Sequence, residues 1–451
     1  MRSSFGRRSA ARARLQWPLG ITVAVAALGA AIYGCSHLSP YYREGHGLSA
    51  AWINNDDIAY RLLLIGDAGS PDSKGEPALQ ALASQVNQIP QRTTVVFLGD
   101  NIYERGMPEP APTPDPAAEA AVKAADILVS DIFQTRKEAE RVINAQVDVI
   151  RGNGAHAIFI PGNHDWDQSN SGGWKRILAL QAYLRELHER DGLDVELLPA
   201  DGCPGPAAVP LSNVAELLAI DTQWWLAGDT SAEKPTLTRN PTGCQYVTEP
   251  AIGDALRDML EHAAHDKRRA VVVGHHPLAS HGPHGGFSEG LTHIFPMYVA
   301  RYYVPVYLEW FPLPIVGSAV VGLRACCSPS AQDIPNGTNR HMRRELLRSM
   351  EEAATDGAAP LAYVAGHDHG LQVLQSNSGP QHLLVSGLGS SDRASTVGSA
   401  GNTLFAHANP DAPGFMQIDF MRDGRARFAV LEYAGKQEPP VEMYSFFDKQ
   451  E

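Results

Sequence analysis

The sequence predicts an α/β fold, and three observations support this prediction. Short apolar runs without polar alternation recur along the chain, as expected of strands buried on both faces of a sheet. Segments with helical apolar spacing separate these runs, which is typical of βαβ units. With 44% hydrophobic and 19% charged residues, the 451-residue chain can bury a large core. No repeat of solenoid length is evident, so we expect one domain with insertions.

The expected strands are short and rich in β-branched or aromatic residues. In chain order they are 59–65, 94–98, 157–160, 207–211, 215–220, 271–273 and 361–365. Apolar residues at helical spacing predict helices at 78–89, 136–151, 174–190, 250–266 and 340–356. Pro77 suits the start of the first helix, where its missing N–H costs nothing. Residues 372–433 are expected to form short strands and turns.

The first 34 residues read as an export signal. Five arginines without an acidic residue precede an uncharged run from Trp17 to Tyr33. Residues 32–35 resemble a bacterial lipobox, which would place a lipid on Cys35 after cleavage. An uncleaved signal-anchor and a soluble secreted form are the alternatives. We therefore expect an exported, periplasmic or cell-surface protein that is anchored in the membrane, with a linker over 35–57.

The cysteine content fits export, and the net charge excludes one class of function. The formal net charge of −13 argues against a nucleic-acid scaffold role, which normally requires a basic face. Beyond Cys35, four cysteines remain and allow three pairings: Cys203, Cys244, Cys326 and Cys327. We favour a Cys203–Cys244 disulfide, because both residues lie in one Pro/Gly/Thr-rich insertion. Free buried thiols are the alternative.

Five of the predicted strands end in clusters of polar residues. The clusters are Gly66-Asp67-Ala68-Gly69, Gly99-Asp100-Asn101-Ile102-Tyr103, Gly162-Asn163-His164-Asp165, Gly274-His275-His276-Pro277 and Gly366-His367-Asp368-His369. Any one of them is typical of an ordinary turn. Together they predict a metal site, because the carboxyl ends of strands in an α/β sheet converge on one crevice. Carboxylate, amide, phenol and imidazole donors suit iron, manganese or zinc, and no cysteine takes part.

The order of these motifs resembles that of the calcineurin-like metallophosphoesterases, over residues 59–374. Tyr103, three residues after Asp100, makes the chain similar to the purple acid phosphatases, especially the tartrate-resistant type. The resemblance implies a four-layer α/β/β/α sandwich with an inserted apolar lid. The catalytic domain would span 58–435, followed by a C-terminal tail over 436–451.

The resemblance also implies a dinuclear metal site in which Asp100 bridges two ions. A trivalent iron (Fe³⁺) would be bound by Asp67, Asp100, Tyr103 and His369. A divalent ion (Fe²⁺, Zn²⁺ or Mn²⁺) would be bound by Asp100, Asn163, His275 and His367. His164 matches a histidine that contacts substrate and acts as a general acid. Asp165 would orient its imidazole.

The implied reaction is hydrolysis of phosphate monoesters, as in acid phosphatases, by attack of metal-bound hydroxide on phosphorus. His281 resembles a second substrate-facing histidine, with an ordinary loop histidine as the alternative. A phosphodiesterase or pyrophosphatase acting on a nucleotide or a lipid-linked substrate is the alternative within enzymes. A non-catalytic metal-binding envelope protein is the alternative outside them.

Three insertions depart from the family pattern, near 104–126, 200–245 and 285–340. Within the third, residues 294–323 carry only two charged residues and many aromatic ones. Prolines within this segment argue against a regular membrane-spanning helix. We expect an apolar lid that rests on the membrane interface or covers the active site. A lid that packs only on its own domain is the alternative.

Overall fold

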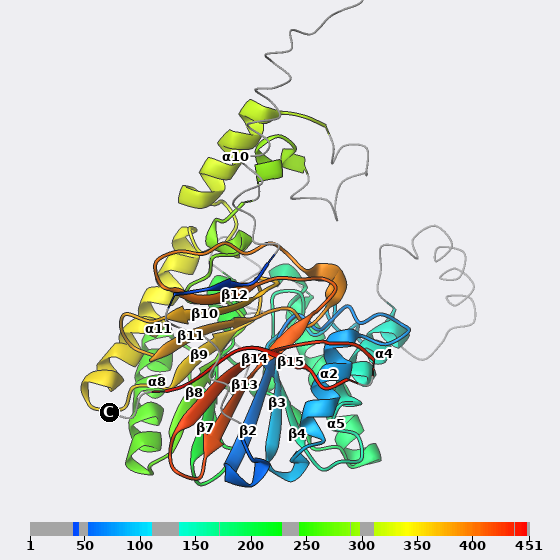
Figure 1. Cartoon of the computed structure of the whole chain (residues 1–451), viewed down its shortest axis with the longest axis vertical. Coiled ribbons are helices and arrows are strands. Elements are labelled where there is room, and N and C mark those ends of the chain that lie inside the picture. The colour runs from blue at the N-terminus through cyan, green and yellow to red at the C-terminus, as the bar shows by residue number, and fades with distance from the viewer. Residues whose placement is uncertain are drawn as a thin grey trace, which may run out of the picture.

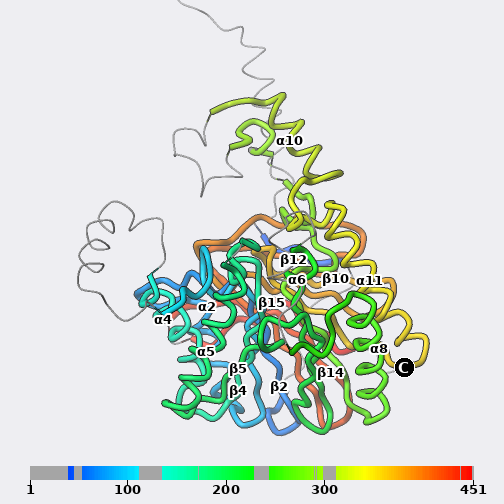
Figure 2. The backbone as a smooth tube through the Cα atoms, turned by 180° about the vertical axis from the view of Figure 1, so that it is seen from behind, coloured from blue at the N-terminus to red at the C-terminus, as the bar shows by residue number. Residues whose placement is uncertain are grey.

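Two sheets lie face to face, and helices cover their outer faces (Figures 1 and 2). The computed structural model describes residues 39–44, 53–110, 135–170, 172–227, 243–288, 290–297, 311–436 and 438–448. Three clusters of buried side chains separate the four layers. The predicted α/β/β/α sandwich is therefore confirmed.

The seven-stranded sheet has the order β15-β14-β13-β2-β3-β4-β5. Its parallel strands are β2 (Ile58–Ile65), β3 (Thr93–Phe97), β4 (His156–Phe159) and β5 (Val195–Leu197). The helices between them are α2 (Pro77–Val86), α4 (Arg136–Val147) and α5 (Gly173–Asp191). Three antiparallel strands extend the sheet: β13 (Gly414–Met421), β14 (Ala426–Glu432) and β15 (Val441–Phe447). The expectation of a C-terminal tail over 436–451 is therefore corrected, because β15 is an edge strand of the sheet.

The eight-stranded sheet has the order β1-β12-β10-β11-β9-β8-β7-β6. Its parallel strands are β7 (Ala215–Ala219), β8 (Arg269–Val273), β9 (Ala362–Ala365) and β11 (His382–Ser386). The antiparallel strands are β6 (Ala207–Pro210), β10 (Leu371–Gln375), β12 (Thr403–His407) and β1 (Tyr41–Tyr42). The helices α6 (Thr222–Leu226), α8 (Glu249–His265) and α11 (Gly337–Thr355) accompany it. β1 lies within the expected linker, so that linker contributes a short edge strand.

The lack of polar alternation in the strands follows from burial on both faces. In β2, Leu62 and Leu64 point into the core between the two sheets. Leu63 and Ile65 point to the other face and pack against the helices. Burial of such a side chain is worth about 1.5–3 kcal/mol, so an apolar residue is favoured at every position of the strand.

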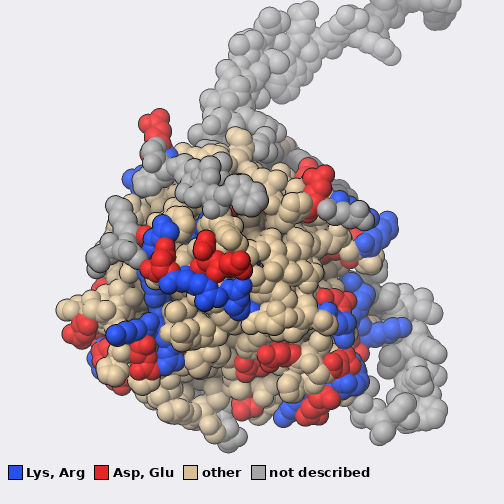
Figure 3. Space-filling model, turned by 60° about the horizontal axis from the view of Figure 1, so that its bottom comes forward, with Lys and Arg blue, Asp and Glu red and all other residues tan. Residues whose placement is uncertain are grey.

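The third insertion forms a helix that projects from one end of the molecule. Helix α10 (Pro314–Cys327) begins at Pro314 and stands above β12 in Figures 1 and 2. Residues 298–310 of the expected lid lie outside the described residues, as do Cys35, 1–34, 111–134 and 228–242. Within the described ranges, no helix combines the length and apolar character needed to cross a membrane. At the opposite end of the molecule, acidic and basic side chains lie intermixed (Figure 3).

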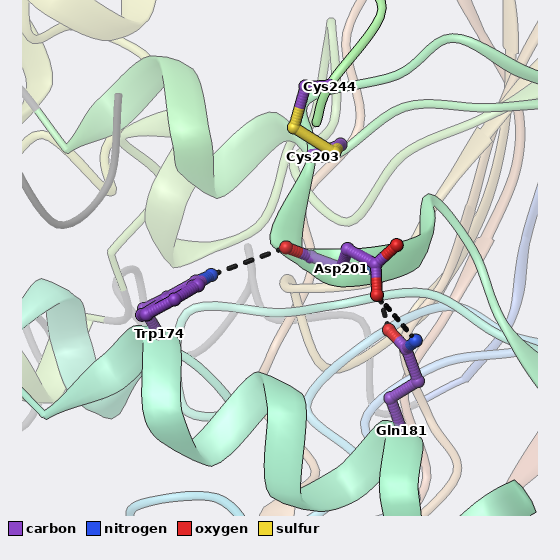
Figure 4. The surroundings of a disulfide bond; sticks show 5 residues. All are labelled: Trp174, Gln181, Asp201, Cys203 and Cys244. Atoms are coloured by element: carbon purple, nitrogen blue, oxygen red, sulfur yellow. Dashed lines mark hydrogen bonds between the residues drawn. A yellow bond between two sulfur atoms is a disulfide. The ribbon is translucent and has the colours of Figure 1, made fainter. Parts of the chain in front are cut away.

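The expected disulfide between Cys203 and Cys244 is confirmed, with a Cα–Cα distance of 5.5 Å. It anchors the turn at Asp201, which contacts helix α5 (Figure 4). The Gln181 amide donates to Asp201 Oδ1 at 2.9 Å, and the Asp201 N–H donates back to Gln181 Oε1 at 2.6 Å. Cys326 and Cys327, at the end of α10, are free and exposed.

Candidate metal centre

The structure brings the seven predicted ligands together at the carboxyl ends of five strands. They follow β2, β3, β4, β8 and β9, which belong to both sheets. Most of them are buried: Asp67, Asp100, Tyr103, Asn163, His275 and His367, while His369 is half-buried. The strand ends therefore converge as the sequence predicted, even though the strands come from different sheets.

The backbone at these strand ends is unusual. Asp67, Asp100 and His367 have positive φ angles of 60°, 53° and 70°. A left-handed conformation at a residue other than glycine costs of order 1–3 kcal/mol, and it is typical of functional sites. Gly162 lies directly against the backbone of Asp100, so a Cβ there would collide with it. Tight turns and close backbone approaches thus bring the donor side chains together.

The first cluster of donors contains Asp67, Tyr103 and His369. The Tyr103 hydroxyl donates to Asp67 Oδ1 at 2.9 Å and lies 3.1 Å from His369 Nε2. His369 Nε2 is also 3.3 Å from Asp67 Oδ1. The guanidinium of Arg393 covers the Tyr103 ring at 4.0 Å from its centroid and pairs with Glu104. A carboxylate oxygen, a phenol oxygen and an imidazole nitrogen, all able to bind a metal, therefore lie close together.

The second cluster contains Asn163, His275 and His367. His275 Nε2 lies 3.0 Å from Asn163 Oδ1 and 3.2 Å from His367 Nδ1. Asp100 Oδ1 is 3.4 Å from His275 Nε2. The Asp100 carboxylate therefore reaches the second cluster.

Backbone carbonyls determine which nitrogen of each histidine carries the proton. Leu98 O accepts from His275 Nδ1 at 2.8 Å, and Arg393 O accepts from His369 Nδ1 at 2.7 Å. Gln332 O accepts in the same way from His367 Nε2 at 3.0 Å. Because a carbonyl can only accept, each of these nitrogens carries the hydrogen. When a ring is neutral, its other nitrogen presents a lone pair to its cluster.

The second cluster is therefore a group of acceptors that face one another. When both rings are neutral, lone pairs of His275 Nε2, His367 Nδ1 and Asn163 Oδ1 meet at 3.0–3.2 Å with no hydrogen between them. Such contacts are unfavourable on their own, and a cation placed between them would make each one favourable. Histidines whose second nitrogen donates to a carbonyl are typical metal ligands. The residues present therefore fit a bound cation.

The pKa values of two predicted ligands, Tyr103 and Asp100, are shifted in opposite directions. Burial, reinforced by Asp67, raises the pKa of Tyr103 well above its ordinary value. A strongly charged cation would therefore be needed to deprotonate this phenol. Burial alone would raise the pKa of Asp100, but His275 and His164 lower it below its ordinary value. Asp100 is therefore ionised and available as a ligand.

His164 lies beside the clusters without joining them. Its Nδ1 donates to Glu104 O at 2.7 Å, so Nε2 presents the lone pair and accepts from the Gln168 amide at 3.0 Å. Nε2 is 3.9 Å from Asp100 Oδ2, farther than the distances within the clusters. This position suits a group that contacts substrate.

Asp165 has a different role from the expected one. Its carboxylate accepts from the Gly162 N–H at 2.9 Å, the Asn101 N–H at 3.1 Å and the Asn101 side-chain amide at 2.9 Å. The Glu104 carbonyl, rather than Asp165, orients the His164 imidazole. Asp165 instead ties together the loops that carry Asp100 and Asn163.

His281 does not lie against the predicted ligands, and His284 takes that place. The His281 ring bonds to Asn402 Oδ1 at 2.8 Å. The His284 ring lies 4.0 Å from the His367 ring, centroid to centroid, and its Nδ1 donates to Asp333 at 2.7 Å. The geometry therefore favours His284 over His281 as the second histidine beside the site. Both belong to one short segment, His281-Gly282-Pro283-His284, and spacing alone could not choose between them.

His276 was not singled out in the sequence, but it lies within ligand distance of His275 and His367. Both of its nitrogens already have partners, since Nδ1 faces Thr222 Oγ1 at 2.8 Å and Nε2 faces Gln332 Oε1 at 2.6 Å. Burial lowers its pKa well below the ordinary value, so the ring is neutral. Both nitrogens of His276 therefore point to Thr222 and Gln332, and the ring packs beside His275 and His367 without presenting a lone pair to them.

Comparisons with known proteins identify a family for this chain. The family model described as calcineurin-like phosphoesterase matches residues 60–304. No curated protein matches the chain. Among solved structures, GAP50, the anchor in the inner membrane complex of Plasmodium, is 16% identical, with a TM-score of 0.42 and coverage of 85% of this chain and 88% of that chain. A dimetal phosphatase from Danio rerio is 12% identical, with a TM-score of 0.39 and coverage of 86% of this chain and 99% of that chain. Since the family match spans more than half of the sequence and includes four of the five motifs, the chain belongs to the calcineurin-like phosphoesterase family.

Proposed function

We propose that this protein is a dinuclear metal-dependent hydrolase of phosphate monoesters, similar to the purple acid phosphatases. Its family supports phosphoester chemistry. The observation that carries the proposal is the pair of adjacent donor clusters with Asp100 beside them. The lone pairs that meet at 3.0–3.2 Å in the second cluster need a cation to become favourable contacts.

The two clusters differ in chemistry, and this difference supports two different ions. The first cluster offers the Asp67 carboxylate and the Tyr103 phenol, which would become an anionic oxygen donor only on binding a strongly charged cation such as Fe³⁺. The second, with two neutral imidazoles and the Asn163 amide, suits a divalent ion such as Fe²⁺, Zn²⁺ or Mn²⁺. When bound, such a pair of ions would supply Lewis-acid polarisation of the phosphoryl group.

His164 is the residue that we assign to proton transfer. Because Nδ1 is held by the Glu104 carbonyl at 2.7 Å, only Nε2 is placed to exchange a proton with a substrate. A protonated Nε2 would donate to the leaving-group oxygen of the ester. His284, held by Asp333, lies on the side of His367 and would contact the phosphate from the second cluster.

Metal analysis and a visible spectrum of the mature protein, followed by a panel of phosphoesters, test this proposal. We expect two ions for each chain, a broad visible band from tyrosinate and iron, and faster turnover of monoesters than of diesters or pyrophosphates. Faster turnover of diesters or pyrophosphates would replace the monoesterase assignment. A protein that holds two ions and hydrolyses no phosphoester would instead be a metal-binding envelope protein.

We also propose that the enzyme lies outside the cytoplasm, tethered to a membrane by its N-terminus. The basic segment, the apolar run and the lipobox-like residues before Cys35 support this location. Cys35→Ser should abolish lipid addition and release the protein from membrane fractions. A variant that stays in the membrane fraction would favour an uncleaved anchor over a lipoprotein.

A further inference from the structure

Helix α10 carries an apolar stripe that the described part of the protein does not cover. Its large apolar residues are exposed, with 86% for Ile315, 49% for Val316, 40% for Val320 and 60% for Leu323. These positions repeat at helical spacing and therefore form one face. Phe311, just before the helix, is 56% exposed. Exposed apolar faces of this kind mark sites of contact with a protein or a membrane.

The opposite side of α10 is attached to the rest of the domain. Gly317, the one buried residue of the helix, packs directly on the backbone of Thr292 and His293. The Leu313 N–H donates to Ile294 O at 2.7 Å, just before the helix starts. Arg324 bonds to Asp333 with both distances at 3.0 Å. These contacts leave the apolar stripe facing away from the domain.

This inference rests on the N-terminal tether proposed above, whose position indicates what the stripe meets. Cys35 precedes Tyr41 by only six residues, and Tyr41 begins β1, the edge strand beside β12. At about 3.3–3.6 Å for each residue, a tether at Cys35 holds β1 within roughly 20 Å of a membrane. Helix α10 stands at the same end of the molecule as β12 (Figures 1 and 2).

A chain of direct contacts joins this end of the sheet to α10. Residues 398 and 402, in the loop before β12, bond to His281 at 2.8 Å each. Gly286, which follows His281 in the same loop, lies against α10. A Cβ added to Gly286 would be 3.1 Å from Ala325 Cα. The tethered edge and the apolar helix therefore belong to one side of the molecule.

We propose that residues 311–327 dock on the surface of a lipid bilayer, with the stripe of Ile315, Val316, Val320 and Leu323 inserted among the lipids. The tether supplies the membrane, and the stripe supplies an apolar contact with it. The only charged residue of α10 is Arg324, which is already paired with Asp333. Insertion therefore depends on apolar contact and needs no anionic lipid.

Docking in this position would hold the candidate metal centre close to the lipid headgroups. Asp333, which binds Arg324 of α10, also accepts from His284 at 2.7 Å. The His284 ring in turn lies 4.0 Å from the predicted ligand His367. Two side chains thus separate the docking helix from the second donor cluster.

The test maps lipid contacts on the full chain. The protein is reconstituted in phosphatidylcholine vesicles that contain a lipid with a photoactivatable group in its acyl chain, and adducts are located by peptide mass spectrometry. We expect adducts within 311–327 as well as at the N-terminus, with a yield that does not fall when salt is added. Site-resolved mapping separates the helix from the tether in one experiment.

A matched pair of variants checks the stripe itself. Ile315→Ser/Val320→Ser/Leu323→Ser should lower the adduct yield within 311–327 by at least roughly tenfold, because the loss of even one of these buried apolar side chains weakens affinity by about that factor. Val247→Ser/Val441→Ser removes valines that are 39% and 49% exposed elsewhere, and should leave the yield unchanged. Adducts confined to the N-terminus would overturn the proposal. Crosslinks between α10 helices of two chains, without lipid adducts, would overturn it in favour of a second copy of the protein.

Discussion

Replacement of His164 by alanine separates proton transfer from metal binding. The nitrogens of the imidazole make two hydrogen bonds, with Glu104 O at 2.7 Å and with the Gln168 amide at 3.0 Å. Its Nε2 lies 3.9 Å from the nearest oxygen of Asp100, beyond the 3.0–3.4 Å that relates donor atoms of the second cluster. His164→Ala should therefore leave the metal content unchanged.

The expected loss of activity follows from the role of Nε2. A positioned general acid contributes about 10²–10⁴-fold to the rate, which corresponds to about 3–5 kcal/mol of the activation barrier. The loss should be largest for alkyl phosphates, because an alkoxide leaves poorly without a proton. It should be small for nitrophenyl phosphate, whose leaving group is stable as an anion. The lost hydrogen bond to Glu104 should lower the free energy of unfolding by only about 1 kcal/mol.

The assay compares kcat and kcat/KM on an alkyl phosphate and on nitrophenyl phosphate, together with metal analysis of each protein. Gln168→Ala is the matched control, since it removes the partner of Nε2 but keeps the imidazole. We expect this control to retain most activity on both substrates. Loss of metal from the His164 variant would refute the reasoning, because the imidazole would then be a ligand. Unchanged turnover of the alkyl phosphate would show that His164 is only a turn residue.

Three further substitutions test two predicted ligands and the buried carboxyl of Asp221, which caps helix α6. Tyr103→Phe should abolish the visible charge-transfer band of the oxidised protein, whereas a colourless and fully active wild type with two zinc or manganese ions would exclude the iron assignment. Asn163→Ala should weaken occupancy of the divalent site and slow all substrates alike, as measured by metal titration; equal slowing without loss of metal would contradict this. Burial raises the pKa of Asp221 from its ordinary 3.8 to about 7, so the folded protein keeps a proton that the unfolded chain releases. This contribution to stability is complete below about pH 4 and is lost as the pH rises through about 7, by about 4 kcal/mol; Asp221→Asn should flatten that pH dependence in urea unfolding of chelated protein, and an unaltered slope would assign it to other groups.

The strands and the convergence of the candidate ligands could be predicted from the sequence because both depend on local patterns. A strand buried on both faces must be apolar at every position, as in Leu62–Ile65, and this leaves a readable run. Glycines followed by polar residues at the strand ends indicated the candidate ligands, since close backbone approach at Gly162 excludes a side chain. The Cys203–Cys244 disulfide was predictable for a related reason, because both cysteines lie in one insertion.

Other features depended on contacts between segments that are distant in sequence, and only the tertiary structure decided them. Spacing could not choose between His281 and His284, because the choice rests on Asn402 and Asp333, which bind one ring each. Asp165 lies next to His164 in the chain, but its carboxyl group accepts hydrogen bonds from the backbone and side-chain N–H groups of Asn101, at the end of a neighbouring strand.

Strand β15 and helix α10 also combine features that can be read from the sequence with features that only the fold decides. Residues 441–447 are rich in strand-forming residues, and they form β15 by pairing with the edge of β14. The sequence by itself determined that residues 314–327 are apolar and carry one charge. Only the tertiary structure decided that Gly317 packs against the domain while Ile315 and Leu323 face outward, because exposure depends on which neighbours the folded chain supplies.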